Sequence, residues 1–94
     1  MNQELSNRHR KNLRKLAHSL KPIVMIGQHG FTAAVVGEID MALTAHELIK
    51  IRVRGFERGE RRTKVEEVAK ELDAEIVNII GGVVIMYRES SDTD

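Results

Sequence analysis

The sequence has 94 residues, of which 41% are hydrophobic and 31% are charged, a composition typical of one small soluble domain. It contains no cysteine, which excludes disulfides, thiolate catalysis and cysteine-ligated metal sites. No apolar stretch approaches the ~20 residues of a membrane-spanning helix, and no signal-peptide pattern is present, so we expect a cytoplasmic protein.

Charge is unevenly distributed along the sequence, although the formal net value is only +1. Residues 1–30 carry six basic side chains and one acidic one, a net charge of +5. Residues 31–88 are nearly balanced at −1, and the acidic tail at 89–94 carries −3. Segregated charge acts on partners through long-range fields, so the basic N-terminal third predicts a polyanionic partner.

The first predicted element is a helix from about Ser6 to Leu20, with Ser6 as its N-cap and Pro22 as its stop signal. Four apolar residues at helical spacing predict its buried face: Leu13, Leu16, Ala17 and Leu20. The other side and its flank are cationic, with Arg8, Lys11, Arg14 and Lys15, and Lys21 follows. A cationic helix face is often only solvated, but beside a glycine loop it would become a phosphate-contacting surface.

A short apolar run, 23–26, predicts a buried strand that ends at Gly27. A second helix is expected after Thr32, its N-cap, and it ends near Glu47. The next segment, Leu48 to Arg54, alternates apolar and cationic residues, which is typical of a strand with one buried and one solvated face. Its cations, Lys50, Arg52 and Arg54, could protect an edge strand or extend a cationic surface across the sheet.

A third helix is predicted to end near Leu72, with two possible starts: the capping-box pattern of Thr63 and Glu66, or Gly59 and Glu60. Two β-branched runs, 75–80 and 83–87, are separated by Gly81-Gly82 and predict a tight hairpin. The order α-β-α-β-α-β-β indicates a two-layer α/β domain with a mixed four-stranded sheet, spanning 1–94 with its core at about 6–88.

Nothing in the sequence indicates catalysis. No nucleophile elbow, Walker loop, dinucleotide fingerprint or zinc-protease motif is present, and the spacing of His18, His29 and His46 matches no ligand pattern. We therefore expect no enzymatic activity, metal or cofactor. Arg58, Arg61 and Arg62 alternate with acidic residues, and whether they contact a partner stays open.

The most informative motif is Gly27-Gln28-His29-Gly30, between the first strand and the second helix. It could be an ordinary turn that needs a positive φ. Alternatively, glycines let a nucleic-acid backbone approach closely, and the N–H groups and dipole of the following helix favour phosphate. KH domains clamp nucleic-acid backbones with a loop of this kind. Phe31 is interpreted as the hydrophobic anchor of the turn, with base stacking as the alternative.

Several short motifs in order resemble one known family. They are the run from Leu20 to Thr32, then Glu38-Ile39, Ala42-Leu43, the run from His46 to Ile51, Ile80-Gly81 and Tyr87-Arg88. Together they are similar to the CRM domain (chloroplast RNA splicing and ribosome maturation) in its stand-alone bacterial YhbY-like form. Relatives often have Leu at the position of Phe31, and their arginine-rich stretch at 54–62 is less regular. We therefore infer no particular RNA target from the resemblance.

The resemblance implies a fold akin to the C-terminal domain of translation initiation factor three. It also implies RNA binding without catalysis and association with precursors of the large ribosomal subunit, with Gly27 and Gly30 on the family's Gly-x-x-Gly loop. We expect a monomer that binds rRNA through this loop and the basic surface. The alternative is a protein-interaction module that docks on a ribosomal protein through the same face.

Overall fold

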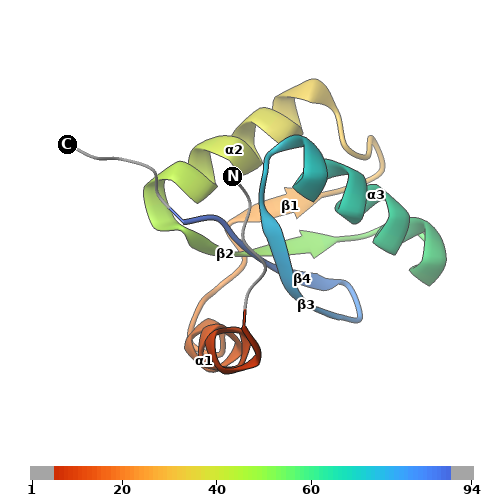
Figure 1. The fold of residues 1–94 in the computed structure, drawn as a ribbon. Helices are drawn as coiled ribbons and strands as arrows, with labels where there is room; N and C mark the ends of the chain where they lie inside the picture. The colour runs from red at the N-terminus through yellow and green to blue at the C-terminus, as the bar shows by residue number, and fades with distance from the viewer. Residues whose placement is uncertain (1–5, 90–94) are drawn as a thin grey trace.

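The computed structural model describes residues 6–89 (Figure 1). Most of the acidic tail therefore lies outside the described residues. The elements are α1 (Asn7–Ala17), β1 (Val24–Ile26), α2 (Ala33–His46), β2 (Leu48–Val53), α3 (Arg58–Glu71), β3 (Glu75–Ile80) and β4 (Val83–Tyr87). This is the predicted order. No helix in the described range is long and apolar enough to cross a membrane.

The four strands form one mixed sheet, as expected, and their order, which the sequence left open, is β1-β2-β4-β3. β1 pairs parallel with β2, while β4 pairs antiparallel with both β2 and β3. The Gly81-Gly82 hairpin is confirmed, because Ile80 pairs with Val83. β2 is a central strand, so the interpretation of its cations as protection for a sheet edge is wrong.

The helices lie on both faces of the sheet, which gives three layers where two were predicted (Figure 1). α2 and α3 cover one face and bury the larger core, which includes Ile39, Ile51 and Val65. α1 lies on the other face, where Leu13 and Ala17 pack against Val77 and Ile85. A second apolar face was hard to see in the sequence because three consecutive buried residues of β4 mask its alternation.

α1 is shorter than predicted, since it ends at Ala17 and not near Leu20. Its last turn tightens: the N–H groups of His18, Ser19 and Leu20 each donate to the carbonyl three residues earlier. The Ser19 hydroxyl also donates to the Leu16 carbonyl. Ser6 caps the other end as predicted, accepting from the His9 N–H. Leu16, predicted to be buried, is 61% exposed. It lies on a flank of α1, outside the helix face that packs on the sheet through Leu13 and Ala17.

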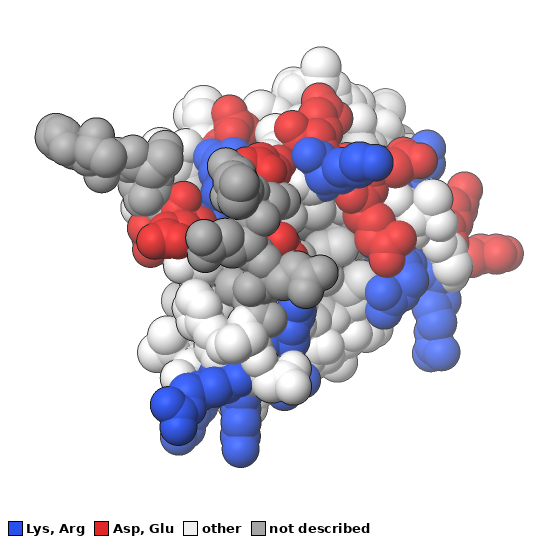
Figure 2. Space-filling model, in the orientation of Figure 1, with Lys and Arg blue, Asp and Glu red and all other residues white. Residues whose placement is uncertain are grey.

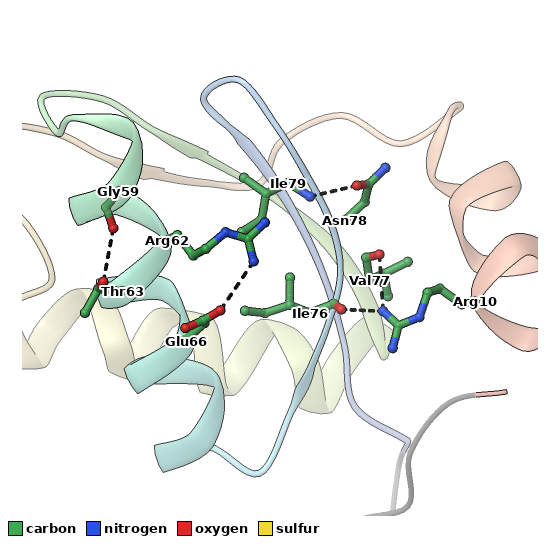
Figure 3. A network of polar contacts seen from close by, with 9 residues as sticks. All are labelled: Arg10, Gly59, Arg62, Thr63, Glu66, Ile76, Val77, Asn78 and Ile79. Carbon is green, nitrogen blue, oxygen red and sulfur yellow. Dashed lines mark hydrogen bonds and ion pairs between the residues drawn. The ribbon is translucent and has the colours of Figure 1, made fainter. Parts of the chain in front are cut away.

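α3 begins at Arg58, which excludes the capping-box start at Thr63. Its N-cap, Glu57, makes no side-chain capping hydrogen bond, and the Thr63 hydroxyl instead donates to the Gly59 carbonyl inside the helix (Figure 3). The helix ends at Glu71 with Leu72 as its C-cap, which agrees with the predicted end near Leu72.

Arg88 joins the end of β4 to both helices of the larger core. It donates to the Asp40 carboxylate at 2.8 Å, the Thr44 hydroxyl at 2.9 Å and the Leu72 carbonyl at 2.9 Å. Charged hydrogen bonds of this kind are among the stronger ones in proteins. They join α2 and the end of α3 to the end of β4.

Candidate nucleic-acid interface

The Gly27–Gly30 loop is a tight turn at the carboxyl end of β1. The Gly30 N–H donates to the Gly27 carbonyl at 2.9 Å, and Gly30 has φ +73°, a conformation that favours glycine. Gly27 has no positive φ, and a Cβ built there meets nothing within 4 Å. The turn therefore requires glycine at position 30 but not at 27, where the fold leaves open space.

The same loop leads into the N-terminus of α2. The Thr32 hydroxyl accepts from the Val35 N–H at 3.2 Å, which confirms the predicted cap. The N–H groups of Ala33 and Ala34, both exposed, have no acceptor within the helix, and the helix dipole is positive here. Gln28 and His29 are exposed beside them. An anion placed at this end of α2 can accept hydrogen bonds from these N–H groups and from the side chains of Gln28 and His29.

Phe31 is the hydrophobic anchor of the loop, in agreement with the interpretation from the sequence. Its ring packs against the larger core and lies 5.8 Å from the ring of Phe56, measured between centroids. A backbone hydrogen bond of 3.0 Å from the Arg54 N–H to the Ile26 carbonyl joins the same two segments. These contacts place the exposed Arg54 next to the Gly27–Gly30 loop, so the two predicted features meet at one end of the sheet.

α1 presents its predicted cations to solvent on the far side of the sheet. Its four predicted contact residues, Arg8, Lys11, Arg14 and Lys15, are all exposed. In Figure 2 basic side chains project from α1, whereas acidic ones lie mainly over α2 and α3. The charge segregation of the sequence is thus also a segregation in space.

The sheet contributes the remaining predicted cations. Lys50 and Arg52 are half-buried and lie on the α1 face of β2, since Ile49, Ile51 and Val53 of the same strand point to the other face. Lys21 is exposed in the segment between α1 and β1. These three side chains therefore share the side of the molecule from which α1 projects.

Arg58, Arg61 and Arg62, whose contact with a partner the sequence left undecided, have different environments. Arg61 is structural, because it donates to the carbonyls of Gly81 at 2.8 Å and Phe56 at 3.1 Å. Arg62 pairs with Glu66 at 3.3 Å on the surface of α3 (Figure 3). Arg58 is exposed at the first turn of α3. Of the three, Arg58 is the one placed to meet a partner at the loop end of the sheet.

A groove of about 500 Å³ lies between the end of α1 and the start of β2. Its lining includes the apolar side chains of Leu16 and Ile23 together with Lys21, His46 and Lys50. The sequence pattern does not predict this groove, because it places both Leu16 and Ile23 on buried faces. Residues 6–89 include no group of three His, Asp or Glu side chains that could hold a metal ion.

Comparison with known proteins shows a family resemblance across almost the whole chain. The model of the CRS1 / YhbY (CRM) domain matches residues 5–88. A Haemophilus influenzae protein named as an RNA-binding protein is 39% identical over 88 residues, which cover 94% of this chain and 89% of that protein. A Pseudomonas aeruginosa protein named as a probable RNA-binding protein is 31% identical, with 92% and 83% covered.

A solved structure has the same fold. It is the solution structure of a hypothetical Staphylococcus aureus protein described as a candidate RNA-binding protein, with a TM-score of 0.82 and 31% sequence identity. The similarity covers 97% of this chain and 95% of that protein. Three helices around a mixed four-stranded sheet are therefore shared with a protein solved in solution.

Proposed function

This chain belongs to the CRS1 / YhbY (CRM) domain family, and we propose that it is a non-catalytic RNA-binding protein that acts on precursors of the large ribosomal subunit. Two relatives are named as an RNA-binding protein and a probable RNA-binding protein, and neither name describes an enzyme. These names support non-catalytic RNA binding. The resemblance to ribosome-maturation proteins supports the second. Cytoplasmic location is part of the proposal, because bacterial ribosomes assemble there.

The observation that carries RNA binding is the open Gly27–Gly30 loop at the N-terminus of α2. An RNA phosphate can approach Gly27 without meeting a side chain, and it gains the exposed N–H groups and the dipole of α2. Arg54 lies beside this loop. Phosphate contacts of this type bind without reading sequence, so we expect RNA shape and accessibility to select the target.

Release is expected to follow from competition. The sequence has no nucleotide-binding loop that could drive dissociation by hydrolysis. A protein that holds exposed phosphates of immature rRNA loses its site once ribosomal proteins or folded RNA cover it. Its presence on particles should therefore be limited to an assembly stage.

The test combines a sucrose gradient with RNA crosslinking in cells. The protein should migrate with large-subunit precursors, be depleted from translating ribosomes, and crosslink to rRNA of that subunit. Deletion should cause incompletely processed large-subunit RNA to accumulate. Equal occupancy on mature polysomes, with normal precursor levels in the deletion strain, would rule out the assembly role and leave a general RNA-binding domain.

The alternative, docking on a protein of the ribosomal particle, is favoured by the apolar groove beside Leu16 and Ile23. Nuclease treatment of isolated complexes separates the two functions. Association that is lost with RNA digestion supports RNA binding. Association that survives digestion, and is abolished by Leu16→Asp, would assign the interaction to a protein partner.

A further inference from the structure

Four of the five exposed large hydrophobic side chains of residues 6–89 lie on the α1 side of the molecule. The five are Leu16, Ile23, Met25, Met41 and Ile80. Only Met41 belongs to α2; Met25 and Ile80 lie on the sheet face that α1 occupies, and Leu16 and Ile23 line the groove beside it. Scattered single hydrophobic residues are normal on a surface, but a group on one sheet face suggests a binding surface.

Strand register places four residues in one line across this face. Met25 is the partner of Arg52, Arg52 the partner of Val83, and Val83 the partner of Ile80. Partners in register point to the same face of a sheet. We name this line, formed by Met25, Arg52, Val83 and Ile80, the open row.

α1 leaves the open row uncovered. It packs over the other end of the same face, against Ile85, Leu48 and Tyr87. Met25 and Ile80 are each 60% exposed, and Arg52 and Val83 are half-buried. In Figure 1 the hairpin between β3 and β4 extends well past α1. The row is thus a sheet surface without a helix over it.

One flank of α1 borders the open row. His9 packs edge-on against Tyr87 at 5.4 Å between ring centroids, at the end of the sheet away from the row, and Leu16 on the same flank lines the groove. With 3.6 residues per turn, Arg14 lies on the opposite flank of α1. Arg14 is exposed on this flank, which is the one nearer the row.

The charge of this face is positive. The open row contains Arg52, and the neighbouring line toward α1, Ile23, Lys50, Ile85 and Asn78, contains Lys50. Neither line includes an acidic residue. A face that combines apolar side chains with unopposed cations complements a ligand that offers both flat apolar surfaces and negative charge.

We propose that the open row is a platform for the unpaired bases of single-stranded RNA, a refinement that rests on the proposed RNA binding. Met25, Val83 and Ile80 would contact base faces, and the planar Arg52 guanidinium can stack on a base or hold a phosphate. The row is continuous with the Gly27–Gly30 loop, because Gly27 follows Met25 by two positions. One strand of RNA could occupy both.

Duplex RNA fits this surface poorly. Its base faces are stacked within the helix, so it presents phosphates and hydroxyl groups to a protein. Apolar side chains such as Met25 and Ile80 gain nothing from those groups. The platform therefore predicts a preference for single strands that survives at salt concentrations where phosphate contacts are weakened.

The test measures affinity for one RNA oligonucleotide as a single strand and as a duplex, at matched salt, using fluorescence anisotropy. The variant is Met25→Ser with Ile80→Ser, and the control is Met41→Ser, a 70% exposed methionine on α2. The parent and the control should prefer the single strand. The double variant should lose about tenfold in single-strand affinity with little change for the duplex.

A second measurement distinguishes loss of base contact from a general loss of RNA affinity. A single strand carrying 2-aminopurine should change its fluorescence on binding the parent but not on binding the double variant at saturation. Equal affinity of the parent for both RNA forms, or full single-strand affinity in a folded double variant, overturns the platform while RNA binding stands. A parent that binds neither form overturns the proposed function itself and the platform with it.

Discussion

Arg10 of α1 donates a hydrogen bond of 2.6 Å from Nη1 to the carbonyl oxygen of Ile76 in β3 (Figure 3). The same nitrogen lies 3.3 Å from the carbonyl of Val77. The register of β3 against β4 shifts between Ile76 and Asn78, so the arginine binds the strand at its bulge. Arg10 is therefore a structural residue among the cations of the N-terminal third, which leaves fewer of them for a partner.

Replacing Arg10 with Ala should lower the free energy of unfolding by roughly 1.5–3 kcal/mol, the range for hydrogen bonds to charged groups. The loss should come from the carbonyls at the bulge and from weaker docking of α1. Arg8→Ala, an exposed change in the same helix, removes the same charge and should stay within about 0.5 kcal/mol of the parent. Urea unfolding measures both, and equal stability of the two variants would contradict the structural role.

Gly82 and Gly81 should respond differently to substitution, although they are neighbours in one hairpin. A Cβ on Gly82 would lie 2.8 Å from the Val53 carbonyl oxygen, and the Gly82 carbonyl accepts from the Val53 N–H at 2.7 Å. Gly82→Ala should therefore cost about 1–3 kcal/mol through overpacking.

Gly81 has φ +57° but open space around its Cβ position. Gly81→Asn, a residue that tolerates this conformation, should cost clearly less than the change at Gly82. Thermal unfolding of the two single variants makes the comparison. If Gly81→Asn proved the more damaging, steric contact with Val53 would not be what requires glycine in the hairpin.

The fold was largely predictable because its signals are local. Alternation in β2, the caps Ser6 and Thr32 and the Gly81-Gly82 turn each depend on residues close in sequence, and each is confirmed. The position of α1 on the sheet face opposite α2 and α3 could not be predicted in this way. Which sheet face a helix covers depends on long-range contacts such as Leu13 with the strands, and no local pattern encodes them.

The candidate site shows the same division. The loop and the exposure of the α1 cations followed from spacing, whereas the separate roles of Arg10, Arg58 and Arg61 did not. An arginine that binds a distant carbonyl has the same sequence signature as one in solvent. Met25 was assigned to a buried run because β-branched neighbours surround it, yet β1 is an edge strand with one uncovered face.

The α1 cations should account for much of the salt dependence of RNA binding. For Z phosphate contacts on a single strand, log K should fall against log salt with a slope of about −0.7Z. Replacing Lys11 and Lys15 with Ala should weaken binding to all sequences alike and reduce that slope by roughly one unit per true contact.

The matched control removes two lysines from the opposite side of the molecule, Lys64→Ala with Lys70→Ala on α3, both exposed. It makes the same change in net charge, so a smaller effect on the slope would locate the contacts on α1. Equal slopes for the two double variants would show that only total charge matters. A parent with no salt dependence would remove α1 from the binding surface.

The Gly27–Gly30 loop can be tested without disturbing the fold. Gln28→Asp with His29→Asp places two negative charges where a phosphate is proposed, and it should abolish loop-dependent RNA binding. Negative charge near the start of α2 stabilises the helix by ~0.3–1 kcal/mol per charge, so unfolding cannot explain the loss. Gln28→Asn with His29→Asn shortens the side chains similarly but adds no charge, and it should retain most of the affinity.

Gly27→Ala asks whether the RNA backbone comes close to the loop. The position has open space and no positive φ, so stability should be unchanged, whereas Gly30→Ala would be strained at φ +73°. If a phosphate packs against Gly27, the added methyl should lower affinity severalfold while the unfolding transition stays in place. Full affinity in both the Gly27→Ala and the double Asp variants, measured at low salt, would make the loop a structural turn and move the phosphate contacts to α1 and the sheet.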